Sequence, residues 1–198
     1  MSPSLSGCLG MMTNSNFLFN SDNLELANQT LKKYPSERKQ SAVMPLLDLA
    51  QRQNGGWLSK SAIEYVANFL EMPYIKVFEV VTFYSMYYTT PVGKYLVQVC
   101  TTTPCWLRGS EQIVKACKEI ISPNQNELSE NEVFSWMEVE CLGACVNAPL
   151  VQINDDFYED LNHESTKNIL QSLIDDKPIQ IGSQTGRQGS KAEQHAKN

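Results

Sequence analysis

Two close pairs of cysteines are the residues of this 198-residue chain best suited to chemistry. Cys100 and Cys105 enclose Thr-Thr-Thr-Pro, and Cys141 and Cys145 enclose Leu-Gly-Ala. Thiolates of paired cysteines bind zinc, bind iron–sulfur clusters or join one another in disulfides. Two pairs that are far apart in the sequence predict one metal site, built from four thiolates on two loops.

The spacing within each pair discriminates among these chemistries. Structural zinc sites most often have about two residues between paired cysteines, and a thioredoxin-type redox pair needs about two. The gaps here are four and three, so zinc is allowed without being favoured, and the redox pair does not fit. A binuclear iron–sulfur cluster needs four cysteines and is wider than one ion, so each loop can present two sulfurs to one end of it. The spacing therefore favours a [2Fe-2S] cluster, with zinc and a disulfide as alternatives.

The other thiols and the two histidines are not expected to do chemistry. Cys117 lies on the apolar face of a predicted helix, where a buried thiol behaves as a small hydrophobe. Cys8 lies in a Ser/Asn-rich leader, where an unstructured thiol is expected. His163 and His195 lie near a helix start and in the C-terminal tail, so we assign them to the solvated surface and predict no catalytic residue.

Composition and charge restrict the partners and the location. The chain has 16 basic and 22 acidic residues and a net charge of −6, which argues against nucleic acid as a partner. No apolar run reaches the length of about 18 residues that spans a bilayer, so direct membrane insertion is not expected. Residues 1–21 contain no Lys or Arg, unlike secretory and mitochondrial targeting segments. We expect a disordered leader on a cytoplasmic protein rather than one of the mitochondrial matrix, with reduced thiols free to bind metal.

The first part of the chain, residues 22–91, has apolar residues at helical spacing and predicts a small helical bundle. The first helix begins near Asp22. The second contains Pro45, which should weaken or kink it. A serine at position 59 or 61 can cap the third helix, and Pro73 opens the fourth.

The apolar period changes after Pro91 and predicts a small α/β domain over residues 92–177. Its expected elements are a strand over 94–100, a helix over 109–121, a strand over 134–140, a hairpin of 150–153 with 157–159, and a helix over 162–175. Each cysteine pair thus begins where a strand ends. Residues 178–198 lack a core pattern and are expected to form an extended or disordered tail.

Several long motifs give the chain a family resemblance. VQVCTTTPCWLRGS (97–110) and VECLGACVNAPLVQIN (139–154) closely resemble the thioredoxin-like [2Fe-2S] subunit of NADH:quinone oxidoreductase, respiratory complex I, which is the E subunit of the bacterial complex. The resemblance covers about residues 23–186. It includes LLDLAQRQNGGWL (46–58), VVTFYSMYYTTPVGKY (80–95) and the segment Gly182–Arg187.

The resemblance implies a helical N-terminal part joined to a thioredoxin-like [2Fe-2S] ferredoxin domain, an α+β or α/β architecture. The four cluster ligands of the family fall on Cys100, Cys105, Cys141 and Cys145. The implied function is that of an electron-transfer subunit of the translocase. Its one cluster exchanges electrons with FMN on the adjacent NADH-oxidising subunit, off the main electron path to quinone.

The implied partners are the subunit that binds FMN and NADH and the iron–sulfur subunit beside it, in the peripheral arm on the cytoplasmic face of the inner membrane. FMN and NADH then belong to the partner, and this chain alone is not expected to oxidise NADH. The sequence contains no glycine-rich dinucleotide fingerprint, in agreement with a carrier. The tail has a local excess of positive charge, so we expect residues up to about Arg187 to lie extended on the flavin subunit, with the remainder mobile.

Three alternatives remain open at this point. The chain is also similar to the small diaphorase subunit of soluble NAD-linked hydrogenases or formate dehydrogenases. A zinc-stabilised interaction module could use the same thiols, and so could a dithiol oxidoreductase. Metal content and co-purifying proteins discriminate among them.

Overall fold

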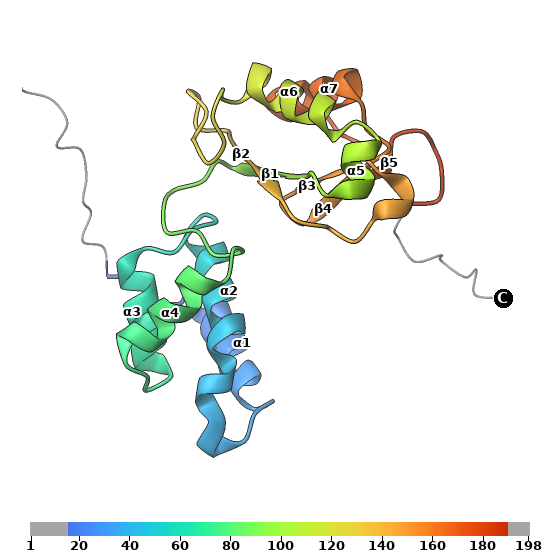
Figure 1. Cartoon of the computed structure of the whole chain (residues 1–198). Coiled ribbons are helices and arrows are strands. Elements are labelled where there is room, and N and C mark those ends of the chain that lie inside the picture. Colours follow the sequence, from blue (N-terminus) through green and yellow to red (C-terminus); the bar gives the residue numbers. More distant parts are fainter. Residues whose placement is uncertain (1–15, 190–198) are drawn as a thin grey trace, which may run out of the picture. The chain divides into compact units, whose positions relative to one another are not determined.

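The computed structural model describes residues 16–189, which divide into two compact units between Thr90 and Pro91. The described part of the N-terminal unit contains only helices and connecting loops. The C-terminal unit combines a sheet with helices (Figure 1).

The N-terminal unit contains four α-helices and one 3-10 helix among its described residues. They are α1 (Ser21–Leu31), η1 (Ser36–Ala42), α2 (Val43–Gln53), α3 (Lys60–Phe69) and α4 (Tyr74–Phe83). Side-chain caps fix two of the helix starts: Asn20 accepts from the Asn23 amide at 2.8 Å, and Ser59 accepts from the Ala62 amide at 3.2 Å. The apolar faces of the helices share one core, which includes Leu46, Leu47, Ala50, Ile63, Val66, Val77 and Val81.

Pro45 does not kink a helix, contrary to the sequence prediction. The predicted second helix is instead two elements, because η1 ends at Ala42 and α2 begins at Val43. Pro45 is therefore in the first turn of α2. Amides there have no partner within the helix, so the missing N–H of proline breaks no hydrogen bond.

The interpretation of residues 1–21 as a disordered leader is wrong for residues 16–21. The Phe17 and Phe19 rings meet the Tyr65 ring edge-on at centroid distances of 5.7 and 5.0 Å. Gln53 donates to the Leu18 carbonyl at 2.8 Å. The packing of these two aromatic rings against α3 stabilises an ordered conformation of this segment, which its Ser/Asn-rich composition did not indicate. Residues 1–15, with Cys8, are outside the described part of the chain.

The C-terminal unit is built on a five-stranded sheet in the order β2-β1-β3-β4-β5. The strands are β1 (Tyr95–Cys100), β2 (Phe134–Val139), β3 (Val151–Ile153), β4 (Asp156–Glu159) and β5 (Gly182–Ser183). β2 runs parallel to β1, and β3 pairs antiparallel with the other side of β1. β3 and β4 are antiparallel to each other and form the predicted hairpin. β5 adds parallel to β4 at the far edge.

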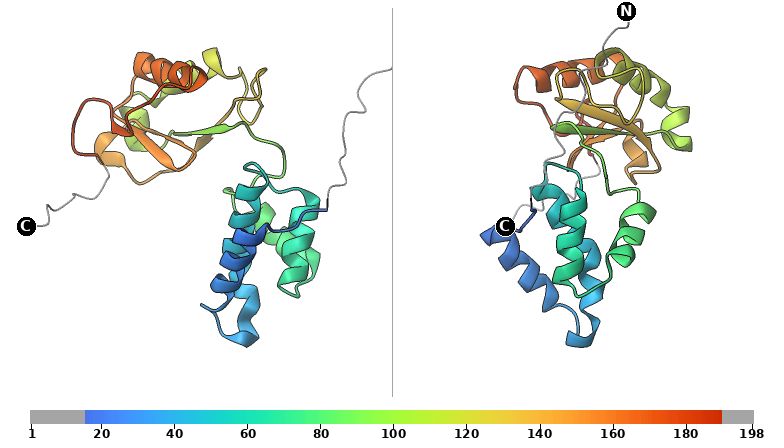
Figure 2. Two further views of the ribbon diagram at one scale, coloured as in Figure 1. Left: turned by 180° about the vertical axis from the view of Figure 1, so that it is seen from behind. Right: turned by 90° about the vertical axis from the view of Figure 1, so that its left-hand side faces the viewer.

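Helices α6 (Ser110–Ile120) and α7 (His163–Ile174) lie side by side on one face of this sheet (Figures 1 and 2). Their apolar residues pack against Val97, Val99 and Trp136 of the sheet. Cys117 is fully buried in this layer, which confirms its predicted role as a small core residue. Burial raises the pKa of the Cys117 thiol to about 12, so it stays protonated at neutral pH.

Three short elements of the C-terminal unit were not predicted from the sequence. They are α5 (Thr103–Leu107), the 3-10 turn η2 (Cys145–Asn147) and β5. Each is too short to show a period of apolar residues. Within residues 16–189, no helix combines the length and apolar character needed to cross a bilayer.

Candidate metal centre

The register of the two parallel strands brings the cysteine pairs to one edge of the sheet. Cys100, the last residue of β1, is opposite Val139, the last residue of β2. The Thr101 amide donates to the Val139 carbonyl at 3.4 Å just beyond. Adjacent parallel strands end at the same edge, so the first cysteine loop (residues 100–105) and the second (residues 141–145) emerge side by side.

The first cysteine loop holds its two thiols in the protein interior. Side chains alternate along a strand, so Cys100 faces away from Val99 and from the core under α6 and α7. Cys105 is in α5. Both cysteines are fully buried, in a small cluster with Ala144, Ala148 and Leu150.

The second cysteine loop presents its thiols at the surface. Cys141 and Cys145 are both exposed, and their sulfurs are 3.5 Å apart. Gly143 between them has φ +85°, a backbone conformation that glycine adopts without strain. None of the five described cysteines is in a disulfide.

Hydrogen bonds and charge link the thiols of the two loops. Burial raises the pKa of Cys105 to about 12, and the neighbouring Cys100 adds to this shift. Burial would also raise the pKa of Cys100, but hydrogen bonds from Thr102, the Leu142 backbone and Cys105 outweigh it and lower that pKa. The shared hydrogen bond with Cys141 raises the pKa of Cys145, and the Cys100 charge acts in the same direction. Of these three thiols, Cys100 is the one whose pKa is lowered.

The sulfurs form two pairs rather than a shell around one point. Among residues 16–189, no three or more His, Cys, Asp or Glu side chains are gathered around a single metal position. One pair is buried and the other exposed. The donor set thus offers two pairs of sulfur ligands at one sheet edge.

Exposed apolar side chains flank both cysteine loops. Trp106 and Leu107, next to Cys105, and Val146, next to Cys145, are 56%, 70% and 72% exposed. A hollow of about 350 Å³ borders the first loop, lined by Thr101, Thr102, Thr103, Trp106 and Glu140.

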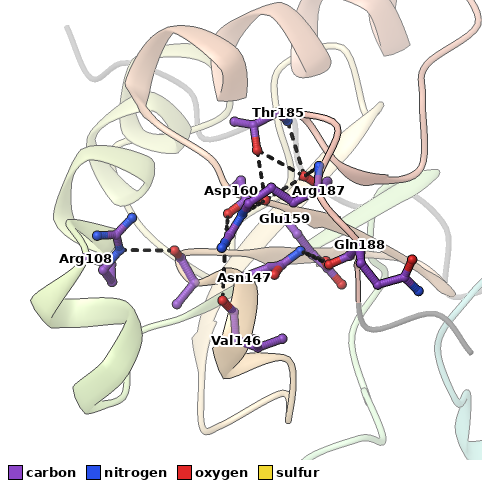
Figure 3. Close-up of polar contacts among 10 residues, drawn as sticks. Arg108, Val146, Asn147, Glu159, Asp160, Thr185, Arg187 and Gln188 are labelled. Atoms are coloured by element: carbon purple, nitrogen blue, oxygen red, sulfur yellow. Dashed lines mark hydrogen bonds and ion pairs between the residues drawn. The ribbon is translucent and has the colours of Figure 1, made fainter.

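The C-terminal segment packs against Val146 and Asn147, which directly follow the second cysteine loop (Figure 3). Asp160, directly after β4, accepts hydrogen bonds from Ser183 at 2.6 Å and Thr185 at 3.2 Å, and it forms an ion pair with Arg187. Arg187 also donates to the Val146 carbonyl at 3.2 Å. The described part of the expected extended or disordered tail is therefore not disordered, because it is hydrogen-bonded to this chain's own domain. Docking of the segment up to Arg187 on the flavin subunit stays a prediction. Residues 190–198 are outside the described part.

The contacts of Asp160 predict that the stability of the protein depends on pH. Burial would raise the pKa of Asp160, but hydrogen bonds from Arg187, Ser183 and Thr185 outweigh it and lower that pKa. The ionised carboxylate therefore stabilises the folded state above about pH 4, and this contribution is lost as pH falls through the lowered pKa. We expect Asp160→Asn to destabilise the protein at pH 7 and the difference from wild type to shrink towards pH 3 in urea unfolding.

The control for this experiment is Asp22→Asn in α1, whose exposed carboxylate accepts a hydrogen bond from the adjacent Ser21 hydroxyl at 3.1 Å. It should show little difference at either pH. If Asp160→Asn lowered the free energy of unfolding by the same amount at pH 7 and pH 3, the assigned charge interaction would be contradicted.

Comparisons with known proteins identify the class that this fold and site define. Residues 27–174 match the family of thioredoxin-like [2Fe-2S] ferredoxins. The chain belongs to this family. A crystal structure of an NAD+-reducing [NiFe]-hydrogenase shares the fold, with a TM-score of 0.57 and 15% identity over 69% of this chain and 23% of that one.

Relatives with much higher identity carry a more specific name. The E subunit of the NADH-quinone oxidoreductase of Rickettsia typhi is 58% identical over 83% of this chain and 96% of its own length. The protein of the same name from Rickettsia bellii is 60% identical over 82% and 97%. The mitochondrial NADH dehydrogenase [ubiquinone] flavoprotein 2 of Dictyostelium discoideum is 49% identical over 90% and 72%.

Proposed function

We propose that Cys100, Cys105, Cys141 and Cys145 together hold one [2Fe-2S] cluster. The observation that carries this proposal is the arrival of two thiol pairs at the ends of the adjacent parallel strands β1 and β2. Four sulfurs in two pairs fit the two ends of a binuclear cluster. The buried pair would hold one iron away from water, while the exposed pair would hold the other near the surface.

We propose further that the chain is an electron-transfer subunit of an NADH-quinone oxidoreductase. Relatives that share more than half of their residues with this chain, over nearly their whole length, carry that name. The fold likeness to a hydrogenase, at 15% identity, gives the soluble hydrogenase alternative no comparable support. When bound, the cluster would accept one electron and release it again.

In this proposal, charged residues of the chain influence how easily the cluster is reduced. The thiolates make the site negative, and reduction makes it more so. Arg108 at the end of α5 would favour the reduced form, whereas Glu138 and Glu140 before Cys141 would oppose it. The exposed side chains next to the cysteines, those of Trp106, Leu107 and Val146, would contact the partner. The distance for electron transfer between the cluster and the partner would then be short.

The partners we propose are the subunit that binds FMN and NADH and the iron–sulfur subunit beside it. FMN and NADH remain on the partner. We place this chain in the peripheral arm on the cytoplasmic face, because the relatives from Rickettsia that share more than half of its residues are bacterial. We also propose that the helical bundle, residues 22–91, and the cluster domain, residues 92–177, are the two functional domains.

Electron transfer from NADH tests this function. The chain, purified without oxygen and mixed with the separately purified flavin subunit, should show the EPR signal of a reduced [2Fe-2S] cluster after NADH is added. NADH added to this chain alone should give no signal, whereas dithionite should. Direct reduction by NADH without the flavin subunit, or none with it, would refute the assigned role.

A further inference from the structure

Three consecutive residues that follow Cys145 are each fixed by another part of the C-terminal unit. Arg187 donates to the Val146 carbonyl at 3.2 Å, and Arg108 donates to the Ala148 carbonyl at 3.5 Å. In Figure 3, Arg108 lies to one side of this segment and Arg187 to the other. Arg108 directly follows α5, so it links the helix that contains Cys105 to the segment that follows Cys145.

Asn147, between these carbonyls, makes the most enclosed contacts. It is 1% exposed. Its side-chain amide donates to Glu159 at 3.0 Å and to the Gln188 carbonyl at 2.8 Å. Its own carbonyl accepts from the Asp160 amide at 2.9 Å. A buried amide with these partners holds the turn η2 in one position.

The segment that supplies Arg187 and Gln188 is itself anchored to β4. We call residues 182–188 the tail strap. Its strand β5 pairs with β4, and the Gln184 amide donates to the Glu159 carbonyl at 3.0 Å. Ser183, Thr185 and Arg187 converge on Asp160, whose side chain is 6% exposed. The strap is thus held against β4 and Asp160 by contacts other than those it makes with η2.

The second cysteine loop has little local structure of its own. Residues 140–144 form neither helix nor strand, and Cys145 is exposed. Ala144 holds the loop in the buried cluster with Cys100 and Cys105, and η2 holds its C-terminal end at Cys145. We propose that the tail strap is a positioning element for Cys145, with Arg187 as its positioning residue, and that it sets how firmly the exposed end of the metal site is held.

This inference rests on the proposed cluster for its metal readouts but not for its structural one. Loss of an outer partner of a metal ligand lowers metal affinity by about 10- to 100-fold. Arg187 contacts Val146, the residue after Cys145, so we take the lower end of this range and expect Arg187→Ala to release iron to a chelator, without oxygen, about tenfold faster than wild type. The EPR spectrum of the dithionite-reduced variant should be broadened or shifted, which a general loss of stability would not produce.

The structural readout is hydrogen exchange of the cluster-free full chain. The amides of 144–148 should exchange faster in Arg187→Ala, whereas those of β1 should not change. Arg187→Lys keeps the charge but loses the planar fork, so it should lie between wild type and Arg187→Ala in all three measurements. It also keeps the test available if Arg187→Ala does not fold. Lys177→Ala, which removes an exposed cation paired with Asp175, is the matched control and should behave as wild type.

The three ways in which these measurements can fail are distinguishable. Wild-type protein without iron would refute the proposed cluster, while the exchange measurement would still test the strap. Unchanged exchange at 144–148 together with unchanged iron release in Arg187→Ala and Arg187→Lys would overturn the inference. A parallel loss in Lys177→Ala would also overturn it, because a general effect of charge would then explain the result.

Discussion

Cys100→Ser abolishes the bound cluster, whereas Cys117→Ser retains it, if the four paired cysteines are the ligands. Cys100 is fully buried at the end of β1, and Cys117, the described thiol outside the two pairs, belongs to a different buried cluster. A serine oxygen is a poorer ligand for iron than a thiolate, and metal binding is coupled to the folding of the ligand loops. Iron and acid-labile sulfide should fall nearly to background in Cys100→Ser, measured per chain after purification without oxygen.

Cys117→Ser is a matched control because it makes the same chemical change at an equally buried site. Cys117 belongs to the core between α6 and the sheet. A hydroxyl buried there should destabilise the protein by about 1–3 kcal/mol without loss of iron. Loss of iron in Cys117→Ser together with full retention in Cys145→Ser would show that the ligand assignment is wrong.

Gly93→Ala should severely destabilise the C-terminal unit. A Cβ at Gly93 would lie 2.4 Å from the Phe134 carbonyl carbon, 2.5 Å from its Cα and 2.6 Å from its nitrogen. These are backbone atoms, and Phe134 is fixed by pairing with Tyr95 and by a side chain that is 1% exposed. The strand must therefore move, and we expect a loss of about 3 kcal/mol in the free energy of unfolding.

Urea unfolding of the purified variant, followed by circular dichroism, measures this loss. Lys94→Ala, one residue along the chain, is the control. Lys94 is exposed and makes a 3.5 Å ion pair with Asp176 and a contact with the Tyr95 ring, so its removal should change stability by no more than about 0.5 kcal/mol. Wild-type stability of Gly93→Ala would mean that β2 is free to shift at its start.

The sequence predicts the parts of the site that depend on local pattern. Alternating apolar residues before Cys100 and Cys141 predict the two strands, and the structure has β1 and β2 there. The apolar spacing around Cys117 correctly separates this thiol from the paired ones. What the pattern cannot give is the parallel register of β1 and β2, because pairing depends on packing between distant segments. That register brings the two cysteine loops together.

The tail strap escaped prediction for a related reason. Ser183, Thr185 and Arg187 are polar, and polar residues without a period are typical of disordered tails. Their partner Asp160 is more than 20 residues away in the sequence, and nothing local in the sequence links the two. Phe17 and Phe19 illustrate the same limit, because their burial depends on Tyr65 in α3.

Iron and acid-labile sulfide analysis of the full chain, purified without oxygen, tests the central claim most directly. A [2Fe-2S] cluster on the four paired thiols predicts about two irons and two labile sulfides per chain, in a red-brown protein that gives a rhombic EPR signal after dithionite. A colourless protein with one zinc per chain, or one with neither iron nor labile sulfide, would contradict the assignment of the cysteines and the electron-transfer function built on it.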